Sequence, residues 1–256
     1  MFIDTHAHLY FDQFNNDREK VIQRAIQNKV SAIITIGTDI ENSAESIKIA
    51  DKFAIVHAAV GIHPNDCENH NIAVLDDIRK MTKLNKVVAL GEIGLDYYHL
   101  ASEKDKQHIF FREQLKLASE LHLPVIVHNR DAHEDVYRIL VEEKAFKTGA
   151  VLHSFSGNID YLESVLSHNF YVSFTGVVTF KNANYYRLID RVPVEQLLLE
   201  TDSPFLAPVP FRGKRNEPAY IKFSADKIAQ IKGIATEELA RITTENAKNL
   251  FQLRLK

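Results

Sequence analysis

Short apolar runs recur along the chain, and longer stretches with a helical repeat of apolar residues separate them. Each run is between four and eight residues long and most contain β-branched residues, which is typical of strands that are buried on both faces of a sheet. The pattern predicts eight strands, over Phe2–Thr5, Ala32–Gly37, Ile55–Gly61, Val87–Glu92, Pro124–His128, Ala150–His153, Phe170–Phe174 and Leu197–Thr201.

The clearest helical stretch is Glu103–Leu121. Its apolar residues return with a period near 3.6 and so form one face, and Pro124 shortly after it favours a break before the next strand. The same reasoning predicts eight further helices, over Asn15–Gln27, Glu41–Phe53, Ala73–Lys83, Asp131–Val141, Asp160–Leu166, Tyr185–Asp190, Ala219–Ile231 and Glu237–Leu253.

Strands and helices alternate over the whole length, which predicts a parallel sheet with right-handed crossover connections. Divided by eight, the 256 residues give 32 for each strand–helix unit, the size expected of one repeat in a (β/α)8 barrel. Because no shift in composition marks a boundary, we expect an α/β fold in which residues 1–256 form a single (β/α)8 TIM-barrel domain. An open doubly wound sheet has the same local pattern and is the alternative.

The composition is that of an ordinary globular protein, with 45% hydrophobic and 25% charged residues. No uncharged apolar run approaches the roughly 18 residues that a membrane span requires, so we expect no membrane association. The single cysteine, Cys67, excludes an intramolecular disulfide. Together with an N-terminus that carries Asp4 and no basic segment, it predicts a cytoplasmic location. No heptad pattern or exposed apolar stripe predicts an obligate protein partner.

The charges nearly balance, since 31 basic and 34 acidic residues give a formal net charge of −3. A protein that coats duplex DNA carries a strongly basic surface, so the charge argues against that class. A nucleic-acid substrate would need a local basic patch.

The twelve histidines bear on function because several of them fall at the ends of predicted strands. All strands of a barrel end on the same face, so residues at their C-terminal ends would meet at one mouth. Imidazole and carboxylate groups are common ligands of divalent metal ions. Each of these residues alone would more often be a hydrogen-bonded core residue, but their joint placement predicts a metal site. They are His6 and His8 after the first strand, Glu92, His128 and His153 at the ends of the fourth, fifth and sixth, and Asp202 after the eighth.

Four imidazoles and two carboxylates can hold two divalent ions, and Glu92 is the natural bridge because a carboxylate has two oxygens. The alternation in His6-Ala7-His8 points both imidazoles to the same side of an extended segment. His63, just after the third strand, is expected either to contact a substrate or to cap a turn. The remaining histidines are expected at the surface, namely His57, His70, His99, His108, His122, His133 and His168.

The strand-end residues lie in segments through which the sequence resembles the TatD-related deoxyribonucleases, a family of metal-dependent, amidohydrolase-like TIM barrels. The resemblance runs from residue 2 to about residue 251, and it implies a (β/α)8 fold and metal-dependent hydrolysis of nucleic-acid phosphodiesters. Ser154 stands where many members carry Cys, but this is not a ligand position. The matching segments are Phe2–His8, Gly61–Pro64, Gly91–Tyr97, Val127–Ala132, His153–Gly157, Leu199–Pro204, Arg212–Pro218 and Thr244–Ala247.

The resemblance also implies two metal sites that share one carboxylate. His6, His8, Glu92 and Asp202 match the first site of the family, and Glu92, His128 and His153 match the second. The implied cofactors are two divalent ions. The family favours Mg or Mn, whereas an imidazole-rich ligand set also suits Zn, so the identity of the metal stays open.

A phosphodiester is anionic and hydrolytically inert, so its hydrolysis needs charge neutralisation and a strong nucleophile. Divalent ions supply both, because they stabilise charge on phosphoryl oxygens and lower the pKa of a bound water. We therefore expect a metal-activated water as nucleophile, with Glu92 and Asp202 as catalytic carboxylates and Asp202 taking the proton of the water. Asp4 and Glu200, close in sequence to the ligands, are expected to orient imidazoles or to hold loops.

Cationic side chains near the predicted mouth are candidates for phosphate binding. Arg130 follows the fifth predicted strand and can form bidentate hydrogen bonds with a phosphate. Arg212 and Lys214 lie in a proline-bounded loop after the last strand, a region where barrels often bind phosphate. Lys181 and Arg215 are expected to be solvated loop charges.

Aromatic residues near the mouth could bind the bases of a single strand by stacking. Tyr97, Tyr98 and Phe205 are candidates, whereas Phe155 is expected in the core. A single-stranded end would enter a barrel mouth more easily than a duplex. We therefore expect an exonuclease that acts on single-stranded DNA ends, with RNA as a further substrate class.

Two alternatives stay open. The first is another hydrolase of the same superfamily, acting on an amide, a lactone or a phosphotriester. The second is a metal-binding homologue without turnover. The bridging position of Glu92 and the basic loop after the last strand favour an anionic substrate over the first alternative.

Overall fold

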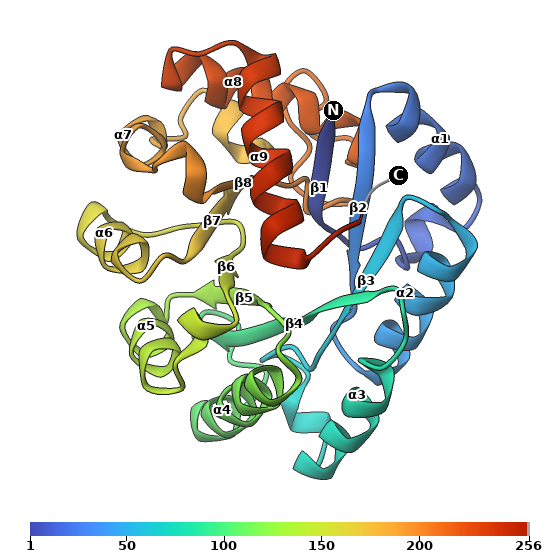
Figure 1. Ribbon diagram of the computed structural model, residues 1–256, viewed down its shortest axis with the longest axis vertical. Helices are drawn as coiled ribbons and strands as arrows, with labels where there is room; N and C mark the ends of the chain where they lie inside the picture. Colours follow the sequence, from blue (N-terminus) through green and yellow to red (C-terminus); the bar gives the residue numbers. More distant parts are fainter. Residues whose placement is uncertain (255–256) are drawn as a thin grey trace.

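The computed structural model describes residues 1–254, so residues 255 and 256 of the predicted domain lie outside the described residues. Eight parallel strands follow one another in chain order around a single sheet (Figure 1). Their bounds are β1 Phe2–Ala7, β2 Val30–Ile36, β3 Val56–Val60, β4 Val87–Asp96, β5 Val125–Arg130, β6 Ala150–Leu152, β7 Tyr171–Phe174 and β8 Leu197–Leu199.

The first strand meets the segment after the last strand, which nearly closes the sheet into a barrel. Ala7 forms a parallel bridge with Ser203. The Asp202 N–H donates to the His6 carbonyl over 2.8 Å. The His8 N–H donates to the Ser203 carbonyl over 2.7 Å. An open sheet would leave these edges unpaired, so the predicted (β/α)8 barrel is confirmed and the doubly wound alternative is wrong.

Nine α-helices lie in the described part of the chain, and each coincides with a predicted helix to within three residues at either end. In the clearest of them, Phe110, Phe111 and Leu115 are buried on one face, and the helix ends where His122 adopts a left-handed conformation. No helix within residues 1–254 is long and apolar enough to cross a membrane. The bounds are α1 Arg18–Gln27, α2 Ile40–Lys52, α3 Leu75–Met81, α4 Lys104–Leu121, α5 His133–Glu142, α6 Ile159–Ser167, α7 Tyr186–Arg191, α8 Ile221–Lys232 and α9 Thr236–Phe251.

The predicted end of the fourth strand at Glu92 is wrong, because β4 continues to Asp96. The pairing of β4 with β5 is irregular between Leu90 and Ile93 and then resumes, with Gly94 opposite His128. A carboxylate in the middle of an apolar run reads as the end of a strand in the sequence. In the structure, Glu92 lies at the irregularity, inside the strand.

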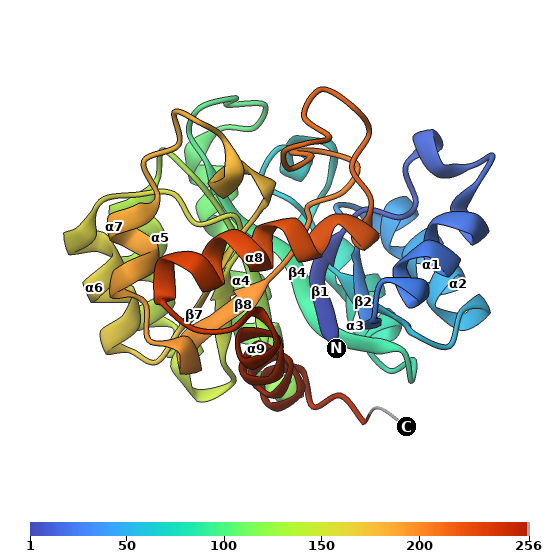
Figure 2. The ribbon, with the colours of Figure 1, turned by 90° about the horizontal axis from the view of Figure 1, so that it is seen from above.

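The core has two layers. The outer layer lies between the strands and the surrounding helices, and the inner layer fills the lower part of the barrel. There α9 and the residues after it pack Leu250, Phe251 and Leu253 against inward-facing residues of the strands. Figure 2 shows α9 across the end where the strands begin, which we call the base. The opposite end, where the strands stop and the long loop 200–217 rises, is the mouth.

Candidate metal centre

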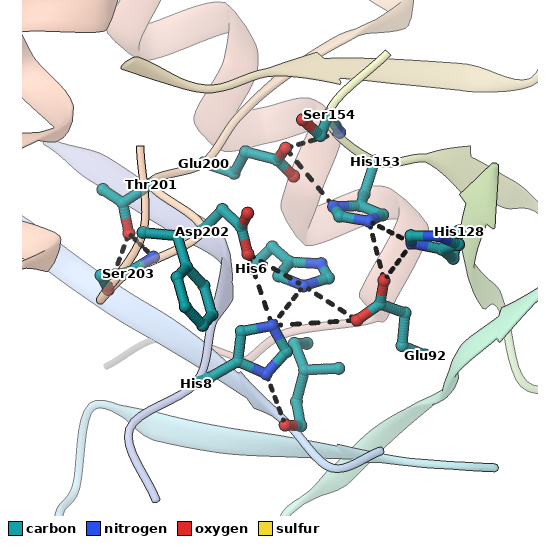
Figure 3. A network of polar contacts seen from close by, with 12 residues as sticks. His6, His8, Glu92, His128, His153, Ser154, Glu200, Thr201, Asp202 and Ser203 are labelled. Carbon is teal, nitrogen blue, oxygen red and sulfur yellow. Dashed lines mark hydrogen bonds and ion pairs between the residues drawn. The ribbon is translucent and has the colours of Figure 1, made fainter. Parts of the chain in front are cut away.

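The six predicted ligand residues come together at the mouth of the barrel (Figure 3). They are almost enclosed by protein, since His6 is 0% and Glu92 is 3% exposed. Figure 3 shows the imidazoles of four histidines turned toward the carboxylate of Glu92, which lies between them. The residues come from five strands, with His6 in β1, His8 just after it, Glu92 in β4, His128 in β5, His153 just after β6 and Asp202 just after β8.

The alternation of side chains along each strand explains why these residues face inward. Ile126 of β5 and Val151 of β6 belong to the inner core. His128 and His153 follow two residues later and therefore project from the same face of their strands. The inward-facing side chains of these strands are thus apolar in the inner core and metal-binding types at the mouth.

One oxygen of Glu92 faces the residues of the first predicted metal site. Glu92 Oε2 lies 3.4 Å from His6 Nε2 and 3.8 Å from His8 Nε2. Asp202 Oδ1 approaches the same two nitrogens, at 3.7 Å from His6 and 3.4 Å from His8. Three side chains and one oxygen of the bridge therefore surround a common point.

The other oxygen of Glu92 faces the second set. Glu92 Oε1 lies 2.9 Å from His128 Nδ1 and 2.8 Å from His153 Nε2. The two imidazole nitrogens are 3.5 Å from each other. Glu92 thus divides its two oxygens between two groups of imidazoles, which is the arrangement that a bridging carboxylate requires.

The ring nitrogens that point away from Glu92 decide which nitrogens can offer a lone pair to a metal ion. His8 Nδ1 lies 3.2 Å from the carbonyl oxygen of Ile36, so it carries a proton and leaves Nε2 free to bind. His128 Nε2 lies 3.1 Å from Asp96 Oδ2, which leaves Nδ1 free. His153 Nδ1 faces Glu200 Oε1 at 3.7 Å.

Asp96 contacts a predicted ligand, His128, and the sequence reasoning missed it. Its Oδ1 accepts hydrogen bonds from the backbone N–H groups of Tyr98 and His99, and its Oδ2 lies beside His128 Nε2. It lies four residues after Glu92 in the same strand. The even spacing places both carboxylates on one face of β4, and this was the signal that could have identified Asp96.

Charge compensation dominates the electrostatics of the site. Burial favours the neutral form of Glu92, but the imidazole of His153 and the hydrogen bond with His128 hold the pKa of this carboxyl well below its usual range. Burial likewise opposes a charge on His153, but Glu92 and Glu200 raise the pKa of its imidazole well above the ordinary value. The buried carboxylates at the mouth therefore require positive charge close to them.

The donor set fits divalent cations, which would supply that charge and bind the imidazoles in their neutral form. His6, His8 and Glu92 place one donor atom each within 4.8 Å of one another, and so do His6, His153 and Asp202. Within residues 1–254, the buried Nδ1 atoms of His6 and His153 form no hydrogen bond. The assignment of individual ligands to two ions stays a prediction.

Asp4 and Glu200 both lie beside the cluster, but in different ways. Asp4 accepts hydrogen bonds from the N–H groups of His6 and Thr201 and from the Thr201 hydroxyl, so it joins β1 to the segment that carries Asp202. Burial raises the pKa of Asp4 to about 8. Glu200 accepts from the Ser154 N–H over 2.6 Å and from the Ser173 hydroxyl over 2.7 Å, which fixes the carboxylate next to His153.

The predicted phosphate-binding cations lie at the rim. Arg130 places its guanidinium carbon 5.0 Å from the ring centre of Tyr98, and Arg212 lies 4.4 Å from that of Phe180. Lys214 is exposed. In the described chain, no hydrogen bond or ion pair joins these three side chains to Glu92 and its neighbours. His63 does reach the cluster, with Nε2 3.6 Å from Glu92 Oε1.

Two predictions about the surroundings are wrong. Arg215 is not a solvated charge, because its guanidinium donates to both carboxylate oxygens of Asp17 and so ties the loop to the start of α1. Tyr97 is not free to stack on both faces, because the Lys104 ammonium lies over its ring at 3.9 Å from the ring centre, and its hydroxyl is bonded to His108 and Asp135.

The structure shows which of the aromatic residues near the mouth are exposed, whereas base stacking stays a prediction. Phe155 is buried, whereas Tyr98 and Phe205 are exposed. Phe205 lies edge-on to Phe11, with ring centres 5.2 Å apart, and Phe11 contacts Tyr10 at 4.9 Å. Phe205 is also 6.1 Å from the ring of His8. An aromatic wall of Tyr10, Phe11 and Phe205 thus borders the cluster, and the sequence reasoning missed its first two members.

Comparisons with known proteins support the fold and a dependence on metal. The family model described as TatD related DNase matches residues 3–252. The protein of Bacillus subtilis (strain 168) named uncharacterized metal-dependent hydrolase YabD is 46% identical over 254 residues, which is 99% of this chain and 100% of that protein. The 3'-5' ssDNA/RNA exonuclease TatD of Salmonella typhimurium is 33% identical and covers 98% of each chain. The crystal structure of YjjV, a TatD homologue from Escherichia coli K12, matches with a TM-score of 0.93 at 33% identity, over 99% of this chain and 98% of that one.

Proposed function

This chain belongs to the TatD related DNase family and is a metal-dependent hydrolase, and we propose that it cleaves the phosphodiester bonds of single-stranded DNA from an end. RNA is a further substrate class of the same proposal. The observation that carries it is the carboxylate of Glu92, which divides its oxygens between two sets of imidazoles. That arrangement suits two cations that share the Glu92 carboxylate and together face one phosphate group.

The residues of the cluster take different roles in this proposal. His6, His8, Glu92 and Asp202 would hold one divalent ion, and Glu92, His128 and His153 would hold the second, with Mg, Mn or Zn as the candidate metals. When bound, such ions supply positive charge against the phosphate and make water a stronger acid. Asp202, whose pKa the neighbouring His8 and His6 hold below its usual value against the effect of burial, would accept the proton of the attacking water.

Cations at the rim support an anionic substrate. Arg130, Arg212 and Lys214 are all exposed, and none of them forms an ion pair within the described residues. Both arginines lie over aromatic rings, which holds the guanidinium planes in place without satisfying their N–H donors. A guanidinium held in this way can receive a phosphate oxygen at low entropic cost.

The aromatic wall supports a single strand over a duplex. Bases that are free of a duplex can stack on exposed rings, at about 1–3 kcal/mol per base. Phe205 is 42% exposed and lies next to His8, so a base that stacked on it would hold its phosphate near the cluster. The Salmonella typhimurium relative carries the name of a 3'-5' ssDNA/RNA exonuclease, which agrees with this choice. A cytoplasmic location is part of the proposal and rests on the single, buried Cys67.

A turnover assay tests the proposal. Metal-free protein would be supplied in turn with Mg²⁺, Mn²⁺ or Zn²⁺ and mixed with end-labelled single-stranded DNA, the matching duplex, and simple lactone and amide substrates. We expect release of mononucleotides from the single strand with at least one metal, and slower release from the duplex. No release with any of the three metals, or turnover of the lactone or amide alone, would contradict the proposal.

A further inference from the structure

His63 is the fifth imidazole at the mouth, and its position alone would make it a metal ligand. It lies just after β3, with Nε2 facing Glu92 Oε1 at 3.6 Å and its ring centre 4.4 Å from that of His128. His63, Glu92 and His128 also place one donor atom each within 4.8 Å of one another. Distance therefore does not separate His63 from the predicted ligands.

The hydrogen bond at His63 Nδ1, on the side of the ring away from Glu92, distinguishes His63 from the predicted ligands. The backbone N–H of Asn65 donates a hydrogen bond to His63 Nδ1 over 3.1 Å. A nitrogen that accepts a hydrogen bond carries no proton, so the single proton of this neutral imidazole is on Nε2. His63 thus presents an N–H to the centre of the site.

Two of the predicted ligands, His8 and His128, have an acceptor instead of a donor at the far nitrogen. His8 Nδ1 faces a carbonyl oxygen and His128 Nε2 faces a carboxylate, so both rings can protonate the far nitrogen and offer a lone pair to a cation. To bind a metal, His63 would need a proton on Nδ1, and two N–H donors would then oppose each other across the contact with Asn65. Leaving such donors unpaired in a buried place costs about 1–3 kcal/mol each.

The turn that carries Asn65 is held in place, so its N–H is not free to move aside. The His63 N–H donates to the Thr38 carbonyl over 2.7 Å, and the Asp66 N–H donates to the His63 carbonyl over 2.9 Å. The Asn65 side chain donates to Asp96 Oδ2 over 3.2 Å. The turn is therefore closed by its own backbone hydrogen bond and is joined to the segment after β2 and to the end of β4.

The N–H at Nε2 also lacks an acceptor. Among the described residues, it forms no hydrogen bond, because Glu92 Oε1 is 3.6 Å away and already lies closer to His128 and His153. A donor without a partner at the edge of an anion-attracting site is suited to an oxygen that arrives with the substrate.

We propose that His63 is a hydrogen-bond donor to a phosphate oxygen of the substrate, through Nε2–H, and is not a metal ligand. The inference rests on the proposed function, because it takes the substrate to be a phosphodiester. It assigns the site a neutral donor in addition to its metal ions. It also explains why a fifth imidazole lies there when Glu92 already has two imidazoles on each side.

The position of the proton can be observed directly. A protein labelled with ¹⁵N in its histidine side chains would be recorded by NMR without metal and with Zn²⁺, a diamagnetic ion, and the His63→Gln variant would identify the signals of His63. We expect a protonated Nε2 and an unprotonated Nδ1 in both states. A protonated Nδ1 in the metal-loaded protein would overturn the proposal.

Binding measurements test the role of that proton. Calorimetry would measure the affinity of the full chain for Mn²⁺, and then the affinity of the Mn²⁺-loaded protein for inorganic phosphate. His63→Leu removes the donor, and His63→Gln keeps an N–H donor on a side chain of similar reach. We expect His63→Leu to bind Mn²⁺ within about twofold of the original chain but phosphate at least about tenfold more weakly. His63→Gln should restore phosphate binding to within about threefold.

The outcomes separate this inference from the proposed function. A tenfold or greater loss of Mn²⁺ affinity in His63→Leu, or unchanged phosphate affinity, would overturn the role of His63 even if the protein degrades DNA. Conversely, the protein could fail to cleave DNA while His63→Leu weakens phosphate binding. This result would contradict the proposed substrate but support His63 as a hydrogen-bond donor to an anion.

Discussion

The base and the mouth of this barrel are built from the same strands and differ by two positions along them. At the base, Ile126 and Val151 face inward and pack beneath α9. Two residues later, His128 and His153 face inward at the mouth. The alternation that builds the core therefore also aims the functional side chains, and only the type of residue changes from one end to the other.

The two ends contribute differently to the free energy of folding. Burial of a large apolar side chain at the base stabilises the fold by about 1.5–3 kcal/mol. At the mouth, a buried carboxylate such as Glu92 costs several kcal/mol unless cations compensate for it. We therefore expect substitutions at the mouth to act mainly on metal binding and turnover, and substitutions at the base to act mainly on stability.

The largest effect should follow Glu92→Gln. The change removes the shared charge, so we expect kcat/KM on single-stranded DNA to fall by at least about 1000-fold. The thermal midpoint should also stop rising when divalent metal is added, because an ion that no longer binds the folded state cannot stabilise it. A labelled-DNA assay and thermal melts with and without Mn²⁺ measure the two effects.

Glu41→Gln is the matched control, since Glu41 is exposed on α2. It should change neither turnover nor the response of the midpoint to metal. If Glu92→Gln kept full turnover, the mouth would not be the reaction site, and the functional contrast between the two ends would fail.

At the base, Phe251→Ala should lower stability without changing chemistry. Phe251 is 2% exposed within the inner core, so its truncation should reduce the free energy of unfolding by about 3–5 kcal/mol. Urea unfolding measures this, and kcat per folded molecule should stay within about twofold of the original chain. Ile109→Ala on the exposed face of α4 is the control for loss of an apolar side chain. A large drop in kcat for folded Phe251→Ala would show that the two ends are coupled.

The sequence was sufficient to predict most of this division. Apolar residues recur with different periods in strands and helices, and this difference located all eight strands. Because side chains alternate along a strand, His128 faces the same side as Ile126, two residues before it. The rule failed in β4, where an irregular register separates Ala89 of the inner core from Glu92 by three residues. A change of register depends on pairing with a neighbouring strand and leaves no trace in local periodicity.

The roles of individual side chains were less predictable. Asp96 and Glu92 lie on one face of the same strand, so the sequence could have predicted a second carboxylate near the metal ligands. The proton position on His63 was not, because it depends on a backbone N–H at Asn65 that any residue type except proline would supply. Arg215 appeared to be a free cation because its partner, Asp17, lies 198 residues away in the chain.

A smaller effect at the mouth should follow Asp96→Asn, which tests whether the carboxylate behind a ligand matters. The amide is a weaker acceptor for His128 Nε2–H and holds the ring less firmly, so we expect Mn²⁺ affinity to fall by about 10–100-fold. Calorimetry measures the affinity, with Asp105→Asn on the exposed face of α4 as control. Unchanged affinity in Asp96→Asn would mean that His128 is oriented by packing alone or does not bind the metal.

The smallest expected effect is on the pH dependence of stability and follows a change of His57, an imidazole at the base. It extends the comparison because folding shifts the pKa of His57 in the opposite direction to that of His153 at the mouth. The expectation that His57 lies at the surface is wrong, because it lies in β3 two residues before Ala59 of the inner core and is only partly exposed. Burial, and then the nearby Lys86, lower the pKa of His57 to about 4, whereas carboxylates raise the pKa of His153 at the mouth. A folded-state pKa below the unfolded value of about 6.5 means that the unfolded chain binds the proton more tightly between these values.

Stability contributed by neutral His57 is therefore present above pH 6.5 and is lost as the pH falls toward 4. Because the side chain is partly exposed, solvent screening reduces the effect to about 1–2 kcal/mol. Urea unfolding at pH 7.5 and pH 5 should show a smaller pH dependence for His57→Gln than for the original chain, with the contribution of the mouth cancelling between the two proteins. His122→Gln, at an exposed position, should keep the original pH dependence. If His57→Gln also kept the full pH dependence, the pKa of His57 would not change on folding, and the proposed contrast with His153 would fail.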